Sequence, residues 1–305
     1  MNELVSIDDL DPPTINSSAV GSYTIANTEL LEARRISAFA AGVYEQSENY
    51  FDDTRRHGLA VHPAIAFSLQ WNARFRLGVA SDSEQKPIVG VHAGTDFVIH
   101  KPFRVGRAVT TQGRLIAFKQ VKSGVFSVER YRMTDASGDL LAELDINYII
   151  LRARLTGGDV ALETIATPPA LPVGVNEPAW SKEIFIPFSM PYHYTACADI
   201  FAPIHTSKRA AQAAGFPNII LHGSATKAIA LGEIINARFD GDPTRIKRLY
   251  GQLRGIVSPN THIRVQVTAV DEVGDDLQVF FQVLNENDEP AVANGLIVGR
   301  RTGVK

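Results

Sequence analysis

The sequence predicts an α+β protein made of two similar units, each with a helix wrapped by an antiparallel sheet. Three observations lead to this prediction. Strand-like segments rich in β-branched and aromatic residues follow one another across turn signals in both halves. A long apolar stretch typical of a buried helix precedes these strands in each half. The same order of elements occurs twice, which indicates an internal duplication.

In the first unit, a short strand is expected at 22–27 and a helix from Thr28, whose hydroxyl can cap it. Residues 61–74 are apolar and open with Pro63, which is typical of the first turn of a helix. Four antiparallel strands are then expected at 96–100, 108–121, 125–135 and 140–153.

The second unit repeats this plan. A strand is expected at 184–189, a helix at 207–216 and a long apolar helix from about Ser224 to 235. Three strands should follow, at 261–270, 276–285 and 293–300. A single apolar helix before a curved antiparallel sheet favours a helix wrapped by that sheet. Two such units in one chain should pair as a pseudo-dimer, much as identical units form two-fold dimers.

Composition sets the predicted boundaries. Residues 1–18 are acidic and polar and are expected to form a flexible N-terminus. The first unit should span 19–155 and the second 183–305. Between them, residues 156–182 contain glycines and prolines with few charges, which indicates a linker.

The overall composition is that of an ordinary globular protein, with 305 residues, 45% hydrophobic residues and a net charge of −3. Lysine and arginine do not gather into a basic face, so nucleic acid is not an expected partner. The single cysteine excludes an intramolecular disulfide and a cysteine-based metal cluster. The first residues lack the features of a secretory signal, and no apolar run is long enough for a membrane span. The expected location is therefore cytoplasmic, with no membrane contact.

The strongest chemical signal lies between Tyr194 and Ala230. It consists of Pro-Ile-His at 203–205, Ala-Gly-Phe at 214–216 and Ile-Leu-His-Gly-Ser-Ala-Thr at 220–226. In order and spacing these motifs resemble the MaoC-like dehydratase and R-specific enoyl-CoA hydratase family. The duplicated layout extends the resemblance over most of the chain, and it implies a double hot-dog fold.

The resemblance also implies a lyase reaction that needs no cofactor. Water is added to a trans-2-enoyl thioester or removed from an (R)-3-hydroxyacyl thioester, with acyl-CoA or another acyl thioester as substrate. By this resemblance His205 is the catalytic histidine, and the N–H of Gly223 stabilises the enolate oxygen. Glycine suits this position because no Cβ blocks the approach and a helix N-terminus favours negative charge.

The sequence departs from the family at the catalytic aspartate. Counting back from His205 places that aspartate at Ile200 and the glycine before it at Asp199. Asp199 is therefore the candidate carboxylate, although a shift of one residue normally turns a side chain away from its neighbour's direction. The alternative is that Asp199 is a capping or surface residue.

Other candidates are assigned to substrate binding. His222 and Ser224 flank Gly223, and His222 is expected to orient rather than to catalyse. In the first unit, Glu45 falls on the family's aspartate position and Tyr50 on its histidine position, so the two could form an acid–base pair. The alternative is a polar helix end.

Metal binding is not expected. His57 and His62 lack a carboxylate or histidine at ligand spacing on a shared helix face. Motifs of nucleotide-binding loops, serine hydrolases and zinc proteases are also missing from the sequence. The basic residues Arg245, Lys247, Arg248 and Arg254 are expected on a solvated face, with contact to CoA phosphates as the alternative.

Three functions remain open. The first is a hydratase or dehydratase of acyl thioesters. The second is a diverged enzyme without the aspartate, such as a double-bond isomerase or a cyclisation catalyst of specialised metabolism. The third is a non-catalytic protein that binds an acyl group or a partner. The sequence leaves open whether the chain forms a homodimer.

Overall fold

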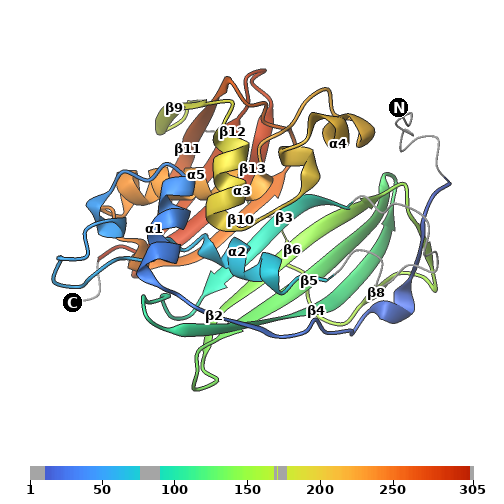
Figure 1. Cartoon of the computed structure of the whole chain (residues 1–305), viewed down its shortest axis with the longest axis horizontal. Coiled ribbons are helices and arrows are strands. Elements are labelled where there is room, and N and C mark those ends of the chain that lie inside the picture. Colours follow the sequence, from blue (N-terminus) through green and yellow to red (C-terminus); the bar gives the residue numbers. More distant parts are fainter. Residues whose placement is uncertain (1–10, 76–89, 168–169, 171–176, 303–305) are drawn as a thin grey trace.

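The structure is a computed structural model that describes residues 11–75, 90–167, 170 and 177–302 (Figure 1). The elements of the first half are β1 (Thr14–Asn16), η2 (Ser17–Ala19), β2 (Asn27–Leu30), α1 (Ala33–Gly42), η3 (Glu48–Tyr50), α2 (Ile65–Asn72), β3 (Gly90–Ile99), β4 (Ala108–Val121), β5 (Gly124–Thr134), β6 (Leu140–Leu151), β7 (Arg154–Thr156) and β8 (Val160–Ala161). Those of the second half are β9 (Trp180–Ile186), α3 (Met190–Ala198), η4 (Pro203–His205), α4 (Lys208–Ala213), α5 (Gly223–Arg238), η5 (Pro243–Arg245), β10 (Ile246–Leu253), β11 (Thr261–Val273), β12 (Asp276–Leu284) and β13 (Pro290–Arg300).

One sheet joins the two halves. Its strand order is β2-β4-β5-β6-β3-β10-β13-β12-β11-β9, with β8 beside β4. The order of the second half mirrors that of the first about the antiparallel pair β3–β10, where Phe97 lies opposite Leu249. Register shifts between Leu115 and Ala117 in β4 and between Val267 and Ala269 in β11 also correspond. The predicted α+β fold with two similar units is confirmed.

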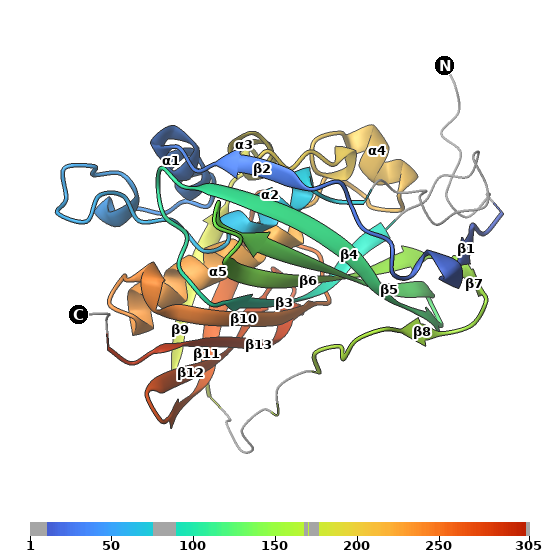
Figure 2. The same ribbon diagram turned by 90° about the horizontal axis from the view of Figure 1, so that it is seen from below.

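The two central helices explain where the core lies. The first three turns of α5 are almost entirely apolar or small, so this helix is buried, and it packs on β10, β11 and β13. Helix α2 is likewise buried over most of its length and packs on β2 and β4. A single hydrophobic cluster contains residues of both helices and both halves of the sheet. Figure 2 shows the shorter helices α1, α3 and α4 together on one side of the molecule.

Some element boundaries differ from the prediction. Thr28 does not cap a helix, because it lies in β2, where its hydroxyl is 2.8 Å from that of Thr110 on β4. Helix α1 begins only at Ala33. Of the strand predicted at 22–27, Tyr23 forms an isolated bridge to Arg114.

The predicted N-terminus and linker lie partly outside the described residues. Residues 14–16 form β1, which pairs in parallel with β7. Within the linker, β8 pairs with β4, and Glu163 forms ion pairs with Arg114 and Arg130. In the described part of the chain, no helix has the length and apolar composition that crossing a membrane requires.

Candidate active site

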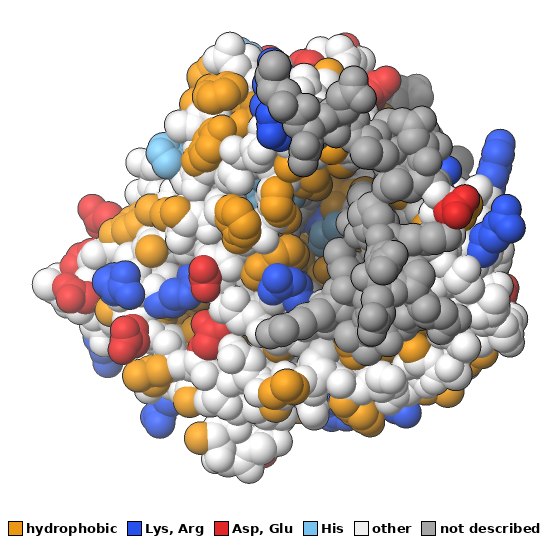
Figure 3. All heavy atoms as spheres, turned by 45° about the vertical axis from the view of Figure 1, so that its right-hand side comes forward, with side chains coloured by type: hydrophobic (Ala, Val, Ile, Leu, Met, Phe, Trp, Pro, Cys, Tyr) orange, Lys and Arg blue, Asp and Glu red, His pale blue; other side chains and the backbone are white. Residues whose placement is uncertain are grey.

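A cavity of about 680 Å³ connects the second-half motif to the interior of the first half. His205, His222, Gly223 and Ser224 line it from the second half. Side chains of α2, β3, β5 and β6 line it from the first half. Figure 3 shows the hollow on the molecular surface, bordered by apolar side chains and with histidine visible inside. The structure therefore brings the motif residues to one enclosed space.

His205 is held in a single tautomer by the backbone. It ends η4, and its Nδ1 lies 2.9 Å from the carbonyl oxygen of Ile220. A carbonyl only accepts hydrogen bonds, so Nδ1 carries the proton and Nε2 has a free lone pair. Burial lowers the pKa of His205 to about 4, with the contact to Ile220 opposing this shift. At neutral pH the ring is therefore uncharged and able to accept a proton.

His222 stacks against His205, with 3.6 Å between ring centroids. Its Nε2 lies 3.3 Å from both the carbonyl oxygen of Ile200 and the hydroxyl of Thr195, so Nε2 donates to the carbonyl. Burial and then the neighbouring His205 lower the pKa of His222, so both rings stay neutral. This arrangement is compatible with the predicted orienting role, because His222 connects the backbone at Ile200 to the ring of His205.

Gly223 begins α5 directly after His222. The first N–H groups of a helix have no partner within the helix, so this N–H is available to an oxyanion. A Cβ at position 223 would collide with the flexible end of the Leu253 side chain, so a larger residue would require that side chain or the start of α5 to move. Ser224 follows it, buried at the wall of the cavity.

The position of the family's aspartate is occupied by an apolar wall. Ile200 is 5% exposed and lines the cavity. Asp199 is exposed, has a left-handed backbone (φ 55°) at the C-terminus of α3 and does not line the cavity. The structure therefore does not bring Asp199 together with His205 and Gly223.

Glu45 and Tyr50 also lie outside the cavity. Both are buried beside His62, whose Nε2 is 3.4 Å from a carboxylate oxygen of Glu45. Glu45 also packs so closely on Gly232 of α5 that no side chain fits at that glycine. The pair is packed between the two halves and does not contact the cavity.

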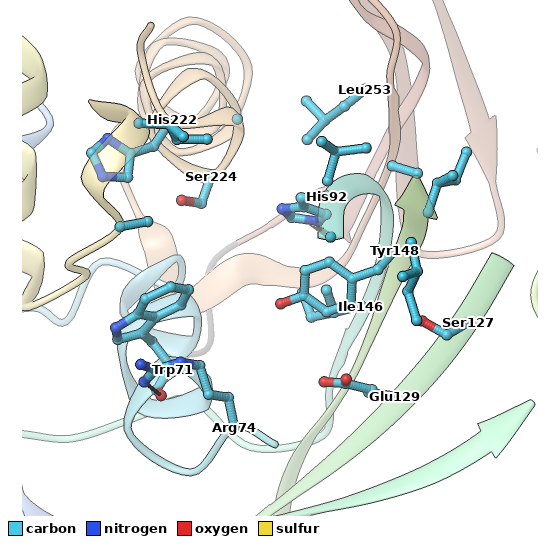
Figure 4. Close-up of a pocket in the computed structure, with 18 of the residues that line it drawn as sticks. Trp71, Arg74, His92, Ser127, Glu129, Ile146, Tyr148, His222, Ser224 and Leu253 are labelled. Atoms are coloured by element: carbon cyan, nitrogen blue, oxygen red, sulfur yellow. Dashed lines mark hydrogen bonds between the residues drawn. The ribbon is translucent and has the colours of Figure 1, made fainter. Parts of the chain in front are cut away.

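The far part of the cavity contains polar residues that the sequence analysis missed. They are Gln70 on α2, His92 on β3, Glu129 on β5 and Tyr148 on β6. Figure 4 shows Tyr148 and Glu129 facing Trp71 and Arg74. A weak signal existed, because polar Ser127, Glu129 and Tyr131 alternate on one face of a strand expected to be buried.

Lys227 is a second residue that the analysis missed, one turn into α5. It is fully buried, and its Nζ lies 2.5 Å from the hydroxyl of Thr95 and 3.3 Å from Nε2 of His92. No described carboxylate pairs with it. Burial therefore lowers the pKa of Lys227 well below its usual value. An isolated lysine in an otherwise apolar helix was the available signal.

We expect Lys227→Met to raise the free energy of unfolding at neutral pH by about 1–3 kcal/mol. Between the lowered folded pKa and about 10.4, the unfolded chain binds a proton that the folded chain does not. Wild-type stability should therefore rise with pH relative to the variant, by at most about 1.4 kcal/mol per pH unit. Denaturant unfolding from pH 7 to 10 measures the difference in free energy of unfolding between Lys227→Met and wild type, which should narrow as the pH rises.

Lys182→Met is the matched control, because Lys182 is half exposed and pairs with Glu233 at the surface. The difference in free energy of unfolding between Lys182→Met and wild type should not change comparably with pH. A stability difference between wild type and Lys227→Met that stayed constant up to pH 10 would show that Lys227 is charged in the folded protein.

Most of the basic residues predicted on a solvated face are neutralised. Arg245 is 3% exposed and pairs with Asp240, while Lys247 pairs with Asp276 and Arg248 with Asp96. Of the four, only Arg254 lines the cavity, and it is also exposed, which places it at the opening. Among the described residues, no group of three or more His, Cys, Asp or Glu side chains could hold a metal ion.

Comparisons with known proteins find similar sequences for both halves. Residues 192–289 match the family described as "MaoC like domain", and residues 18–144 match "FAS1-like, dehydratase domain region". "Enoyl-CoA hydratase 2, peroxisomal" of Arabidopsis thaliana is 39% identical over 59 residues. That stretch is only 19% of this chain and 19% of the plant protein.

Solved structures show the same fold at low identity. A MaoC-like dehydratase from Phytophthora capsici superimposes with a TM-score of 0.78 at 17% identity, covering 94% of this chain and 98% of that one. A Mycobacterium tuberculosis protein described as a double hot-dog has a TM-score of 0.59 at 12% identity, covering 97% of both chains. The chain thus has a double hot-dog fold, with a region that matches the MaoC-like domain in its second half and one that matches the FAS1-like dehydratase region in its first.

Proposed function

We propose that this protein adds water to an enoyl thioester, or removes it from the (R)-3-hydroxyacyl thioester. The observation that carries the proposal is that neutral His205 and the N–H of Gly223 line one cavity large enough for an acyl group. The family and the enoyl-CoA hydratase named among its relatives support this reaction class.

The proposed chemistry needs one base and one oxyanion donor. Nε2 of His205 takes a proton from water as the water oxygen bonds to C3. The electrons of the C2–C3 double bond move toward the thioester, whose oxygen becomes an enolate held by the N–H of Gly223. Protonated His205 then returns its proton to C2. Dehydration follows the same steps in reverse.

We further propose a CoA thioester as the substrate. Arg254 stands at the opening, where its guanidinium lies 2.7 Å from the side-chain oxygen of Gln252 and remains exposed. A phosphate group of CoA passing this point would meet a positive charge. The alternative substrate is a thioester of the same acyl group attached to a carrier protein.

The test is the loss of the enoyl-thioester absorbance band with crotonyl-CoA and longer trans-2-enoyl-CoAs. Wild type should consume the band and form the 3-hydroxyacyl product. Asp199→Asn should retain wild-type kcat/KM within about threefold, because surface substitutions rarely matter and Asp199 is exposed outside the cavity. No turnover at any chain length would reject hydration, and a large loss in Asp199→Asn would return that carboxylate to the site.

One observation favours a second candidate, isomerisation of the enoyl double bond. Ile200 leaves the expected carboxylate position apolar. A single histidine could remove a proton from C4 to form a dienolate, whose oxygen the same N–H would hold, and return the proton to C2 to give the 3-enoyl thioester, with no water consumed. Product analysis by NMR separates the two reactions, because only hydration places a hydroxyl on C3. If neither product forms but acyl-CoA binds, the protein is a non-catalytic acyl binder.

A further inference from the structure

The far part of the cavity contains a polar belt, defined here as Gln70, His92, Glu129 and Tyr148. Gln70 comes from α2, and the other three come from neighbouring strands of the cavity wall. His92 on β3 lies opposite Tyr148 on β6, and Tyr148 lies opposite Ser127 on β5. On the side of the second half, the cavity continues to Leu253 and Gly223.

Beyond the belt the cavity becomes apolar again. Ser127 lies opposite Phe118 on the next strand, β4. Leu115, Phe118 and Ile150 all line this end and form a hydrophobic cluster with Ile15. An acyl chain that extends from Gly223 would therefore cross an apolar stretch, then the polar belt, then a second apolar stretch.

One member of the belt offers hydrogen-bonding capacity to the cavity. Glu129 is enclosed by protein but accessible from the cavity, and the Tyr131 hydroxyl donates to one of its oxygens at 2.5 Å. Gln70 is 4% exposed and lies beside the hydroxyls of Tyr131 and Tyr148, with its Nε2 shielded from the cavity. A plain alkyl chain that displaced water from Glu129 would remove hydrogen bonds of its carboxyl without replacing them, which is unfavourable.

We propose that the acyl group bound here carries a hydroxyl in mid-chain, held by Glu129. A hydroxyl both accepts and donates, so it can donate to the carboxyl of Glu129 and can also accept from that carboxyl when it is protonated. Charged substituents fit less well. Arg74 acts electrostatically on this carboxyl and would repel an ammonium group, while Glu129 itself would repel a carboxylate.

Burial raises the pKa of Glu129 to about 7, against the opposing effects of Tyr131 and Arg74. At neutral pH the carboxyl therefore exists in both forms, and either form has an oxygen that accepts from a hydroxyl. The inference rests on the proposed function only in taking an acyl thioester as the ligand.

The experiment compares trans-2-enoyl-CoAs of one chain length that carry a single hydroxyl at successive carbons with the unsubstituted chain. One hydroxyl position should be preferred by about 10- to 100-fold in kcat/KM. Glu129→Leu should abolish that preference, so that in this variant the hydroxylated and unsubstituted chains have the same kcat/KM. Glu129→Gln, which keeps a polar group of the same shape, should retain part of the preference.

Glu163→Leu is the matched control, because Glu163 pairs with Arg114 and Arg130 and does not line the cavity. It should leave the preference intact, and thermal unfolding of every variant checks the fold. A wild type that shows no preferred hydroxyl position would overturn the inference. A preference that survives Glu129→Leu would also overturn it.

A binding assay separates this inference from the proposed function. Trp71 lines the cavity, and the second tryptophan of the chain, Trp180, lies on β9, so a Trp180→Phe protein reports on the cavity by fluorescence. Saturated acyl-CoAs with and without the hydroxyl are the probes. Tighter binding of the hydroxylated chain without any turnover would support the belt and reject the hydratase. Turnover without a hydroxyl preference in either assay would support the hydratase and reject the hydroxyl-binding role of the belt.

Discussion

His205→Ala should lower kcat/KM for hydration by about 10³-fold, because the residue is the one base assigned to both proton transfers. The loss should be mainly in kcat. The imidazole is small and lies at the wall of the cavity, so its removal changes little of the surface that binds the acyl chain. Steady-state kinetics on the best enoyl-CoA measures the effect.

The matched control is His100→Ala, since His100 is half exposed beside Glu143 and far from the cavity in the fold. It should leave kcat/KM unchanged. The wild-type pH profile gives an independent check. With the pKa of His205 near 4, kcat/KM should stay level down to about pH 5, where a histidine of ordinary pKa would already be charged. Retention of most activity in His205→Ala would remove His205 from the mechanism.

The strands were the most predictable part of the fold. Residues 108–121 form β4 over the predicted range, because β-branched and aromatic residues there alternate between two faces and turn residues bound the segment. Strand β10 was missed because its lysine and arginine suggested a solvated face. In the structure Lys247 and Arg248 are neutralised by Asp276 and Asp96, partners that are distant in sequence.

The candidate site was predictable only where it is local in sequence. His205, His222 and Gly223 fall within one short segment, so their order and spacing could be compared with a family motif. The polar belt comes from α2, β3, β5 and β6, and only strand pairing and the packing of α2 on the sheet bring it together. No periodicity in a single segment could place Gln70 near Glu129.

Glu45 and Tyr50 show that a matching position in the sequence does not by itself place a residue at the cavity. Glu45 and Tyr50 occupy the motif positions when the two units are compared residue by residue. His62 is followed by Pro63 just before α2, whereas His222 is followed by Gly223, and proline has no N–H to offer an oxyanion. Close packing of Glu45 on Gly232 fills the remaining space. The two units thus have side chains at corresponding motif positions, but only the motif residues of the second unit line the cavity.

Gly223→Ala should lower kcat by about 10²-fold, the typical effect of losing one oxyanion donor. The N–H itself is retained, so the loss must come from geometry. The new Cβ would collide with Leu253, which also lines the cavity, and either this side chain or the start of α5 must move. Kinetics on the same enoyl-CoA measures the loss, and a fully active variant would show that oxyanion binding does not depend on glycine at position 223.

The double variant Gly223→Ala/Leu253→Ala shows which movement matters. If displacement of Leu253 misplaces the N–H, shortening Leu253 should restore kcat to within about tenfold of the Leu253→Ala single variant, a clear departure from additivity. If the methyl group itself keeps the thioester oxygen away from the N–H, the two effects should simply add. Both results are consistent with an oxyanion at Gly223. The first would mean that glycine is needed to leave space for Leu253, and the second that it is needed to let the thioester oxygen reach the N–H. Since the collision is with the flexible end of a side chain rather than with backbone, we expect a large recovery, and packing against Leu253 is then the reason that this helix begins with glycine.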